Sequence, residues 1–331
     1  MKKFVNDPKD FVAEMLSGLA LANPDTLVYV PEYNLIHRAD GPSDDRVSII
    51  QGSGSGHEPA HVMTVGPGML TAACPGDVFA APPVDYVTET IKRMASAKGV
   101  LLIVNNYTGD RMAFEMAQEL AAADGLDVRT LFVDDDVAVQ DSLYTVGRRG
   151  VAGNFFVMKA VGAAAEAGAD LDELVRIGEK VNAATRTMGL ALTACTPPAK
   201  GAPLFDLEAD QVEFGVGIHG EPGRERRAID SADRMVTDLV DAVAADLEVA
   251  AGDRLALMVN GLGGTPISEL YLAYGIAHRA ITAGGAEVAR SYVGEYCTSL
   301  DMAGLSVTAV RLDDEIEALL AAPAEIAVRV F

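Results

Sequence analysis

The sequence predicts an α/β protein with two α/β domains, each a sheet flanked by helices. Short apolar runs alternate with amphipathic helical patterns along most of the 331 residues, which is typical of sheets covered by helices. Half of the residues are apolar, and the length suits about two domains of ~150 residues. Prolines and glycines interrupt both patterns at 193–210, so we place a boundary near residue 190, between domains 1–190 and 191–331.

Nine short apolar runs predict the strands. The run at 100–104 is the most apolar, which suits a fully buried strand. In chain order the runs are 27–30, 47–50, 100–104, 128–133, 212–218, 255–259, 287–293, 306–312 and 326–331.

Apolar residues at helical spacing predict helices between these strands. One set comprises Leu174, Ile177, Val181, Ala184 and Met188, and another comprises Ile229, Ala232, Val236, Leu239, Val243 and Leu247. A further helix is expected from about Arg111, with one stripe formed by Met112, Met116 and Leu120.

The charge balance excludes two classes of partner. Twenty-six Lys and Arg against forty-eight Asp and Glu give a net charge of −22, whereas nucleic acids and anionic lipids require a basic surface. No apolar run approaches the ~20 residues of a membrane span, and residues 1–10 lack the apolar core of a signal peptide. Three scattered cysteines indicate neither a disulfide framework nor a zinc site. We therefore expect a cytoplasmic protein that binds neither nucleic acid nor membrane.

A glycine loop follows the second strand, where Gly54, Ser55 and Gly56 lead into His57. Closely spaced glycines let a backbone turn sharply and approach a ligand. A dinucleotide-binding loop would continue into a helix, but prolines and glycines interrupt the next residues, and no Gly-Lys-Ser/Thr completes a Walker A motif. The loop is interpreted as a small-ligand cradle with His57 at its rim. A plain glycine turn that carries a surface histidine is the alternative.

A second polar cluster, residues 105–110, follows the buried strand at 100–104. Ligands in α/β proteins bind beyond the carboxyl ends of strands, so Asn105 and Asp110 are candidate site residues. Asp110 also suits the N-cap of the helix that follows, and capping would lower the basicity of its carboxylate. The two roles remain open.

His219 follows a strand pattern in which every second residue is apolar. By this period of two, His219 shares a face with Gly215 and Gly217, and these glycines would leave a trough where a ligand could lie against the strand. A core histidine would share the apolar face instead. Glu221 is either an orienting partner of the imidazole or a solvated turn residue. We expect His37 and His278 to be structural or surface residues.

These motifs together resemble the substrate-binding K subunit of the dihydroxyacetone kinase family. They are GSGSGHEPAH at 52–61, NYTGDR at 106–111, GRRGVAG at 147–153, GIHGEPG at 217–223, NGLGGTP at 260–266 and TSLDMAG at 298–304. The resemblance implies two α/β domains, a homodimer, and a short-chain ketose held as a covalent hemiaminal on His219. It also implies that His57 and Asp110 act on the hydroxyl to be phosphorylated, as base and supporting carboxylate, and that Gly54, Ser55 and Gly56 contact the ketose.

Three residues depart from the family pattern. Ser53 replaces a further glycine, Asn105 replaces a common substrate-contacting lysine, and Ala113 replaces a frequent asparagine. The histidine that would capture the carbonyl is retained, whereas the rim that would recognise hydroxyls is altered. We therefore expect a substrate other than plain dihydroxyacetone, such as the four-carbon ketose erythrulose.

No motif in the chain would hold a nucleotide, and we assign it neither a cofactor nor a metal. In the family that it resembles, ATP or ADP with Mg²⁺ belongs to a helical L subunit or a fused domain. Because the sequence ends at Phe331, we expect a separate L subunit. The phosphoryl donor, ATP or a phosphotransferase-system protein, stays open.

Two other functions compete with the kinase. The first is a ketose sensor that co-activates a transcription regulator, and the second is a dinucleotide oxidoreductase. Retention of His57 and Asp110 beside His219 favours the kinase, because capture alone would need only His219. The oxidoreductase ranks last, because no helix is expected after the glycine loop.

Overall fold

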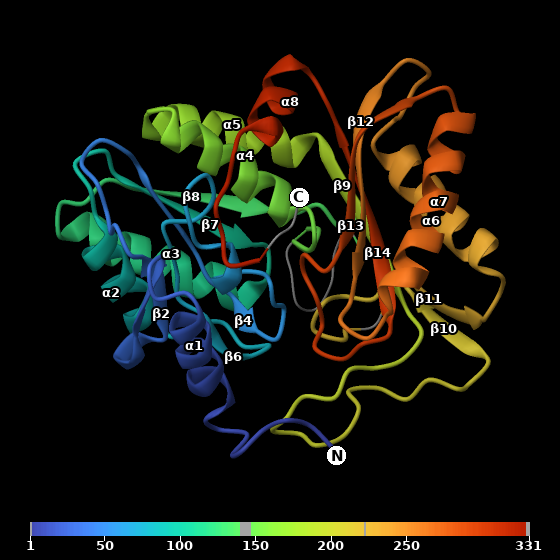
Figure 1. The fold of residues 1–331 in the computed structure, drawn as a ribbon, viewed down its shortest axis with the longest axis horizontal. Helices are drawn as coiled ribbons and strands as arrows, with labels where there is room; N and C mark the ends of the chain where they lie inside the picture. Colours follow the sequence, from blue (N-terminus) through green and yellow to red (C-terminus); the bar gives the residue numbers. More distant parts are fainter. Residues whose placement is uncertain (1, 140–146, 222, 329–331) are drawn as a thin grey trace.

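Two six-stranded sheets lie side by side with helices between and outside them (Figure 1). The computed structural model describes residues 2–139, 147–221 and 223–328. The α/β class with helix-flanked sheets is confirmed.

The first sheet has the strand order β1-β2-β5-β3-β7-β8. Strands β3, β5, β7 and β8 are parallel to one another, whereas β2 pairs antiparallel with both β1 and β5. The strands are β1 (Leu27–Val30), β2 (Leu35–Arg38), β3 (Ser48–Gln51), β5 (Ala72–Ala73), β7 (Val100–Asn105) and β8 (Val128–Val133). Two short strands, β4 (Gly54–Ser55) and β6 (Gly76–Val78), pair with each other beside this sheet.

Helices cover both faces of the first sheet. Strand β7 is buried along its whole length: Leu102 packs toward α2 (Val84–Met94) and α3 (Thr108–Ala123), while Leu101 and Ile103 pack toward α4 (Asn154–Glu166) and α5 (Leu171–Ala183). Burial on both faces explains why this run is continuously apolar rather than alternating. Helix α1 (Phe11–Ala22) packs beside β1.

The second sheet has the strand order β11-β10-β9-β14-β12-β13, and only β12 and β13 are parallel in it. Helices α6 (Ala232–Asp246) and α7 (Ile267–Ala283) cover its outer face (Figure 1). The strands are β9 (Thr185–Ala191), β10 (Gln211–Phe214), β11 (Glu225–Ala228), β12 (Arg254–Gly261), β13 (Glu287–Gly294) and β14 (Gly304–Arg311).

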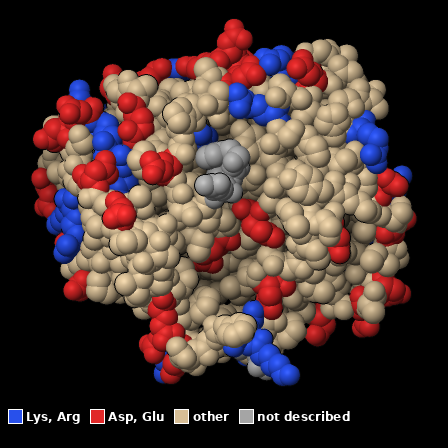
Figure 2. All heavy atoms as spheres, in the orientation of Figure 1, with Lys and Arg blue, Asp and Glu red and all other residues tan. Residues whose placement is uncertain are grey.

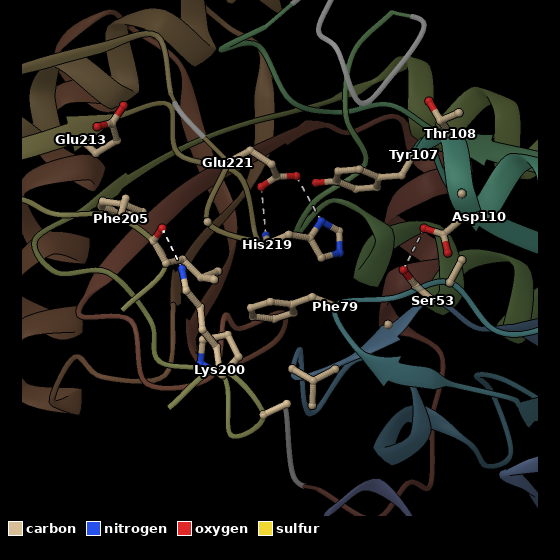
Figure 3. Close-up of a pocket in the computed structure, with 18 of the residues that line it drawn as sticks. Ser53, Phe79, Tyr107, Thr108, Asp110, Lys200, Phe205, Glu213, His219 and Glu221 are labelled. Atoms are coloured by element: carbon tan, nitrogen blue, oxygen red, sulfur yellow. Dashed lines mark hydrogen bonds and ion pairs between the residues drawn. The ribbon is translucent and has the colours of Figure 1, made fainter. Parts of the chain in front are cut away.

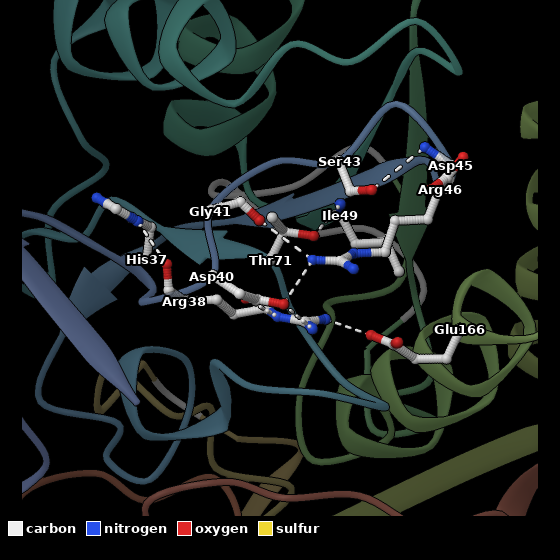
Figure 4. Close-up of polar contacts among 10 residues, drawn as sticks. All are labelled: His37, Arg38, Asp40, Gly41, Ser43, Asp45, Arg46, Ile49, Thr71 and Glu166. Carbon is white, nitrogen blue, oxygen red and sulfur yellow. Dashed lines mark hydrogen bonds and ion pairs between the residues drawn. The ribbon is translucent and has the colours of Figure 1, made fainter. Parts of the chain in front are cut away.

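Helix α4 connects the two halves of the molecule. Almost every residue of α4 is buried, which is expected of a helix that is apolar all round. The hydrophobic core round α4 includes Met258 of the second sheet. Helix α8 (Asp314–Ala321) packs against α4. At the C-terminal end of α4, Glu166 pairs with the buried Arg38 of β2, whose Nη2 also lies 2.7 Å from Asp40 (Figure 4). The ion pair between Arg38 and Glu166 joins the end of α4 to the first sheet.

Three predicted elements differ in the structure. The helical pattern that includes Met188 ends at Ala183, and Met188 belongs to β9. The strand expected at 212–218 ends at Phe214, because Gly215 adopts a left-handed φ of 74°. Residues 326–328 form no strand, and the rest of that predicted strand lies outside the described residues. The domain boundary near residue 190, which falls within β9, stays a prediction.

Acidic side chains are scattered over the face in Figure 2, round its edge and also near its centre, whereas basic side chains lie mostly toward the edge. Within the described ranges, no helix is long and apolar enough to cross a membrane. The same ranges contain no group of three acidic, cysteine or histidine side chains that could hold a metal ion.

Candidate active site

A pocket of about 710 Å³ opens between the two sheets (Figure 3). The first half of the chain contributes the glycine loop and the start of α3. The second half contributes the segment after β10 and the proline-rich segment at 193–210. The predicted residues that line the pocket are Gly54, Asp110 and His219.

The glycine loop is shaped by close backbone packing. A Cβ on Gly54 would lie 2.6 Å from the backbone nitrogen of Ala80, so only glycine fits where the loop crosses this segment. Ser55 donates its hydroxyl to the carbonyl of Gly76 at 2.8 Å, and the backbone N–H of Gly56 donates to the carboxylate of Glu58 at 3.1 Å. Ser55 and Gly56 therefore support the loop from behind, and only Gly54 of the three lines the pocket.

His57 is fully buried and does not line the pocket, so the prediction that it stands at the rim of the glycine loop was wrong. It is an uncharged imidazole with one free nitrogen. Its Nδ1 lies 2.8 Å from the carbonyl oxygen of Thr298, which fixes the proton on Nδ1. Its buried Nε2 has no hydrogen-bond partner among the described residues. The ring stacks on Phe79 with centroids 5.1 Å apart and meets the His219 ring edge-on at 4.7 Å. Burial and the neighbouring His219 hold the pKa of His57 well below its usual value.

Asp110 is a buried carboxyl in the first turn of α3. The N-cap of this helix is Tyr107, so the capping interpretation of Asp110 is wrong. Ser53 donates its hydroxyl to Asp110 Oδ2 at 2.9 Å, while Oδ1 has no partner in the described part of the chain. Burial raises the pKa of Asp110 to about 7, against the opposing effects of His219 and Ser53. Asp110 can therefore hold or release a proton near neutral pH.

His219 lies on the turn beyond β10, with its ring toward Asp110 and Ser53 (Figure 3). Its Nδ1 lies 3.1 Å from Glu221 Oε1, and its backbone N–H donates to Glu221 Oε2 at 3.0 Å. Because the carboxylate of Glu221 accepts a hydrogen bond from Nδ1–H, the proton of the neutral ring lies on Nδ1 and Nε2 carries the free lone pair. The ring stands edge-on to Tyr107, with centroids 4.4 Å apart. Glu221 is thus the orienting partner, and it is buried rather than solvated.

The expected trough beside His219 is already filled by protein. A Cβ on Gly217 would lie 2.0 Å from Glu221 Oε2 and 2.7 Å from Nη1 of Arg149. A Cβ on Gly215 would lie 2.6 Å from the Cβ of Ala138. The prediction of a ligand trough along the strand was therefore wrong: Gly217 makes room for the side chains behind His219.

Asn105 lies at the end of β7 and does not line the pocket. Its Oδ1 accepts from the side-chain amides of Gln51 and Asn154, each at 3.4 Å. The interpretation of Asn105 as a direct ligand contact stays a prediction.

Sequence reasoning missed several residues around the pocket. Phe79 and Tyr107 enclose the His219 ring, and His61 is a further buried histidine whose pKa burial lowers to about 3. The proline-rich segment contributes Lys200 and Phe205 to the far wall. The prolines and glycines of this segment were the one sequence signal that could have indicated its position at a site.

A pocket between two sheets, with the imidazole of His219 turned toward a buried carboxyl group, is typical of a small-molecule-binding α/β protein. The chain belongs to the Dak1 domain family, whose model matches residues 17–328.

Curated relatives match over nearly the whole chain. One is the dihydroxyacetone-binding subunit DhaK of a PTS-dependent dihydroxyacetone kinase from Listeria innocua, 47% identical over 95% of both chains. The corresponding subunit of the PEP-dependent kinase of Escherichia coli is 44% identical, with 98% of this chain and 97% of that one covered. An L-erythrulose 1-kinase of Mycolicibacterium smegmatis is 42% identical over 98% of this chain and 57% of its own length.

Two solved structures share the fold. The dihydroxyacetone kinase of C. freundii superposes with a TM-score of 0.89 at 35% identity, over 99% of this chain and 60% of that one. The dihydroxyacetone kinase operon co-activator DhaQ also gives 0.89, at 34% identity over 96% and 97% of the two chains.

Proposed function

We propose that this chain is the ketose-binding subunit of a two-component dihydroxyacetone-type kinase and holds its substrate as a hemiaminal on His219. The observation that carries the proposal is the geometry of one corner of the pocket. There, His219 has a lone pair available on Nε2, and Asp110 lines the same pocket. The ring of His57 stacks on Phe79 and meets the His219 ring edge-on. The curated relatives that match along their full length are dihydroxyacetone-binding subunits.

Capture is an addition across the carbonyl bond. The Nε2 lone pair of His219 bonds to the carbonyl carbon, and the C=O π pair moves to oxygen. The oxygen takes up a proton and the ring gives up its Nδ1 proton, so that reactants and adduct carry the same charge. Glycerol has no carbonyl and would not be held.

Transfer requires deprotonation of a ketose hydroxyl. The hydroxyl oxygen bonds to the terminal phosphorus of the donor as the bond from that phosphorus to its leaving oxygen breaks, and the hydroxyl proton passes to His57 Nε2. Asp110, with Oδ1 unpartnered among the described residues, is the supporting carboxylate. The nucleotide, ATP or ADP with Mg²⁺, would be held by a helical L subunit. The phosphoryl group would come from ATP that exchanges freely, or from a phosphotransferase-system protein that recharges a tightly held ADP. We expect the present chain to be a homodimer.

The preferred substrate is a four-carbon ketose such as erythrulose. Ser53, one of the departures from the family pattern, lines the pocket. The relative named L-erythrulose 1-kinase is nearly as similar as the dihydroxyacetone-binding subunits.

A ketose-sensing co-activator is the second candidate, and the shared fold of DhaQ supports it. The site favours the kinase, since capture requires His219 alone, whereas His57 and Asp110 supply proton-accepting groups beside it.

The test combines the chain with dihydroxyacetone or either enantiomer of erythrulose, with and without the L subunit and Mg²⁺-nucleotide. We expect a ketose adduct by native intact mass without the partner, and phosphorylated product only with it. His219→Ala should abolish the adduct, while His57→Asn should keep it and slow transfer by about 100-fold or more.

Three results would count against these assignments. Product formed without the partner would contradict the two-component kinase, and normal turnover by His57→Asn would remove His57 as the base. A strong preference for dihydroxyacetone would overturn the four-carbon substrate.

A further inference from the structure

We propose that Glu221 and Arg149 are positioning residues that make His219 Nε2 the nucleophile. Arg149 helps to keep the carboxyl group of Glu221 ionised, and ionised Glu221 holds the His219 proton on Nδ1. The inference rests on the proposed capture of a ketose by His219.

Glu221 contacts His219 twice, through the ring and through the backbone. Its Oε1 lies 3.1 Å from Nδ1 and its Oε2 accepts the backbone N–H at 3.0 Å, so the carboxyl group cannot turn away without losing both contacts. Only 8% of Glu221 is exposed. A buried carboxylate at this position also compensates the positive charge that develops on the ring while the bond at Nε2 forms.

Arg149 lies behind Glu221 and is the largest fully buried side chain described. Its Nε donates to Asp136 at 2.7 Å and its Nη2 donates to the carbonyl of Gly215 at 2.6 Å. Its Nη1 and Glu221 Oε2 both lie within 2.7 Å of the place where a Cβ on Gly217 would stand. The guanidinium therefore lies near Glu221, on the side of Gly217, and its charge acts on the carboxyl group, while Asp136 and Gly215 hold its other nitrogens.

The ionisation state of Glu221 determines which nitrogen of His219 is nucleophilic. Burial by itself raises the pKa of Glu221, whereas a protonated His219 ring, the hydrogen bond from His219 and the guanidinium of Arg149 lower it to about 2. When the ring is uncharged, the hydrogen bond and Arg149 are the groups that still favour the ionised carboxylate. If Glu221 were protonated, its O–H would donate to Nδ1, and the ring proton would lie on Nε2. Nε2 would then have no lone pair for the carbonyl carbon.

The GRRGVAG motif at 147–153 thus supplies Arg149, which acts through Glu221 and does not line the pocket. The groups that face Glu221 are His219, Arg149 and Tyr107, with Asp136 on the far side of Arg149.

The experiment compares the wild type with Glu221→Gln and Arg149→Met. It records the tautomer of His219 by ¹⁵N NMR of the free protein at about pH 8 and the rate of ketose adduct formation. Gln keeps the size of Glu221 but can turn its NH₂ toward Nδ1, so we expect Nε2–H signals and capture slowed by about 10- to 100-fold. Arg149→Met should shift the tautomer in the same direction.

Glu213→Gln is the matched control for the tautomer. Glu213 is also a buried carboxylate on the pocket wall, but it pairs with Arg226 at 2.6 Å rather than with His219, so this variant should keep the Nδ1–H signals. Thermal unfolding identifies variants that fail to fold. If Arg149→Met does not fold, the isosteric variant Glu221→Gln decides the outcome.

Two failures are distinguishable. If the wild type forms no adduct with any ketose, the proposed function fails, while the NMR spectra still decide the tautomer. If the wild type forms the adduct and Glu221→Gln keeps both its tautomer and its capture rate, the positioning role is overturned.

Discussion

Asp110 is a buried carboxyl group with one oxygen, Oδ1, that lacks a hydrogen-bond partner among the described residues. Ser53, the residue in place of a usual glycine, holds the other oxygen. Because burial raises the pKa of Asp110 to about 7, the folded state resists ionising this group.

This property predicts an unusual dependence of stability on pH. The folded protein keeps the Asp110 proton up to about pH 7, whereas the unfolded chain loses it near pH 4, so this group lowers the free energy of unfolding as pH rises between the two values. The loss approaches about 4 kcal/mol for three pKa units. Asp110→Asn should therefore unfold at a higher temperature than the wild type at pH 8, with a smaller difference at pH 4.5.

Calorimetry of both proteins at the two pH values measures this difference. An equal shift at both pH values would show that Asp110 is ionised in the fold at low pH and would contradict the raised pKa. The same variant should lose phosphoryl transfer.

Individual site residues were predictable where the local sequence is distinctive. His57, Asp110 and His219 each stand in a short polar motif after a strand. Glu221 was noted but its burial was not foreseen, because a glutamate in a glycine turn is usually solvated. The role of Arg149 could not be predicted from the sequence, because its contact with Gly215, just after β10 of the second sheet, depends on tertiary packing.

Helix α3 illustrates the limit of pattern reasoning for an element. Its stripe of Met112, Met116 and Leu120 faces out, and its buried face is formed by small residues and Phe114. A helix that packs closely on a sheet can bury alanines while longer apolar side chains remain exposed.

Two substitutions on α3 test this assignment of faces. Met116→Glu should change the free energy of unfolding by no more than about 0.5 kcal/mol, because the side chain is half exposed. Phe114→Ala should cost about 3–5 kcal/mol through the cavity it leaves. Urea denaturation of both variants measures these values, and a large loss for Met116→Glu would place the wrong face in the core.

The turn after β10 depends on a glycine for a reason that a strand pattern could not reveal. Gly217→Ala would place a methyl group 2.0 Å from Glu221 Oε2, so the carboxyl group must move away from His219. We expect ketose capture to slow by at least about 10-fold.

Gly18→Ala is the control for this substitution. Apart from its chain neighbours and the backbone of its own helix, no atom of the described residues lies within 4 Å of a Cβ added at Gly18 on α1. Alanine should therefore raise the free energy of unfolding by about 0.5–1 kcal/mol. Unchanged capture by Gly217→Ala would show that Glu221 tolerates displacement.

Element boundaries failed where two regular patterns meet. Helical spacing continues across Ala183 into Met188, yet the chain enters β9 at Thr185, where it pairs with β14. Pairing with a strand more than a hundred residues away overrides local periodicity, and sequence alone does not reveal such a partner.

The molecule as a whole follows from alternating strands and helices, which the sequence displays plainly. The central position of α4 does not follow from this alternation of strands and helices. A single core joins α4 to residues of both sheets, including Met258, and Arg38 fixes the far end of the helix. This arrangement holds the glycine loop opposite the turn that carries His219, so the pocket is formed from both halves of the chain.

The central claim is that an uncharged His219, oriented by Glu221, bonds to the carbonyl carbon of a short ketose. A crystal structure of the protein soaked with erythrulose tests it most directly. The account predicts continuous density from His219 Nε2 to a tetrahedral carbon, with Glu221 still beside Nδ1. A sugar seated in the pocket without that bond, or none beside the ring, would contradict it.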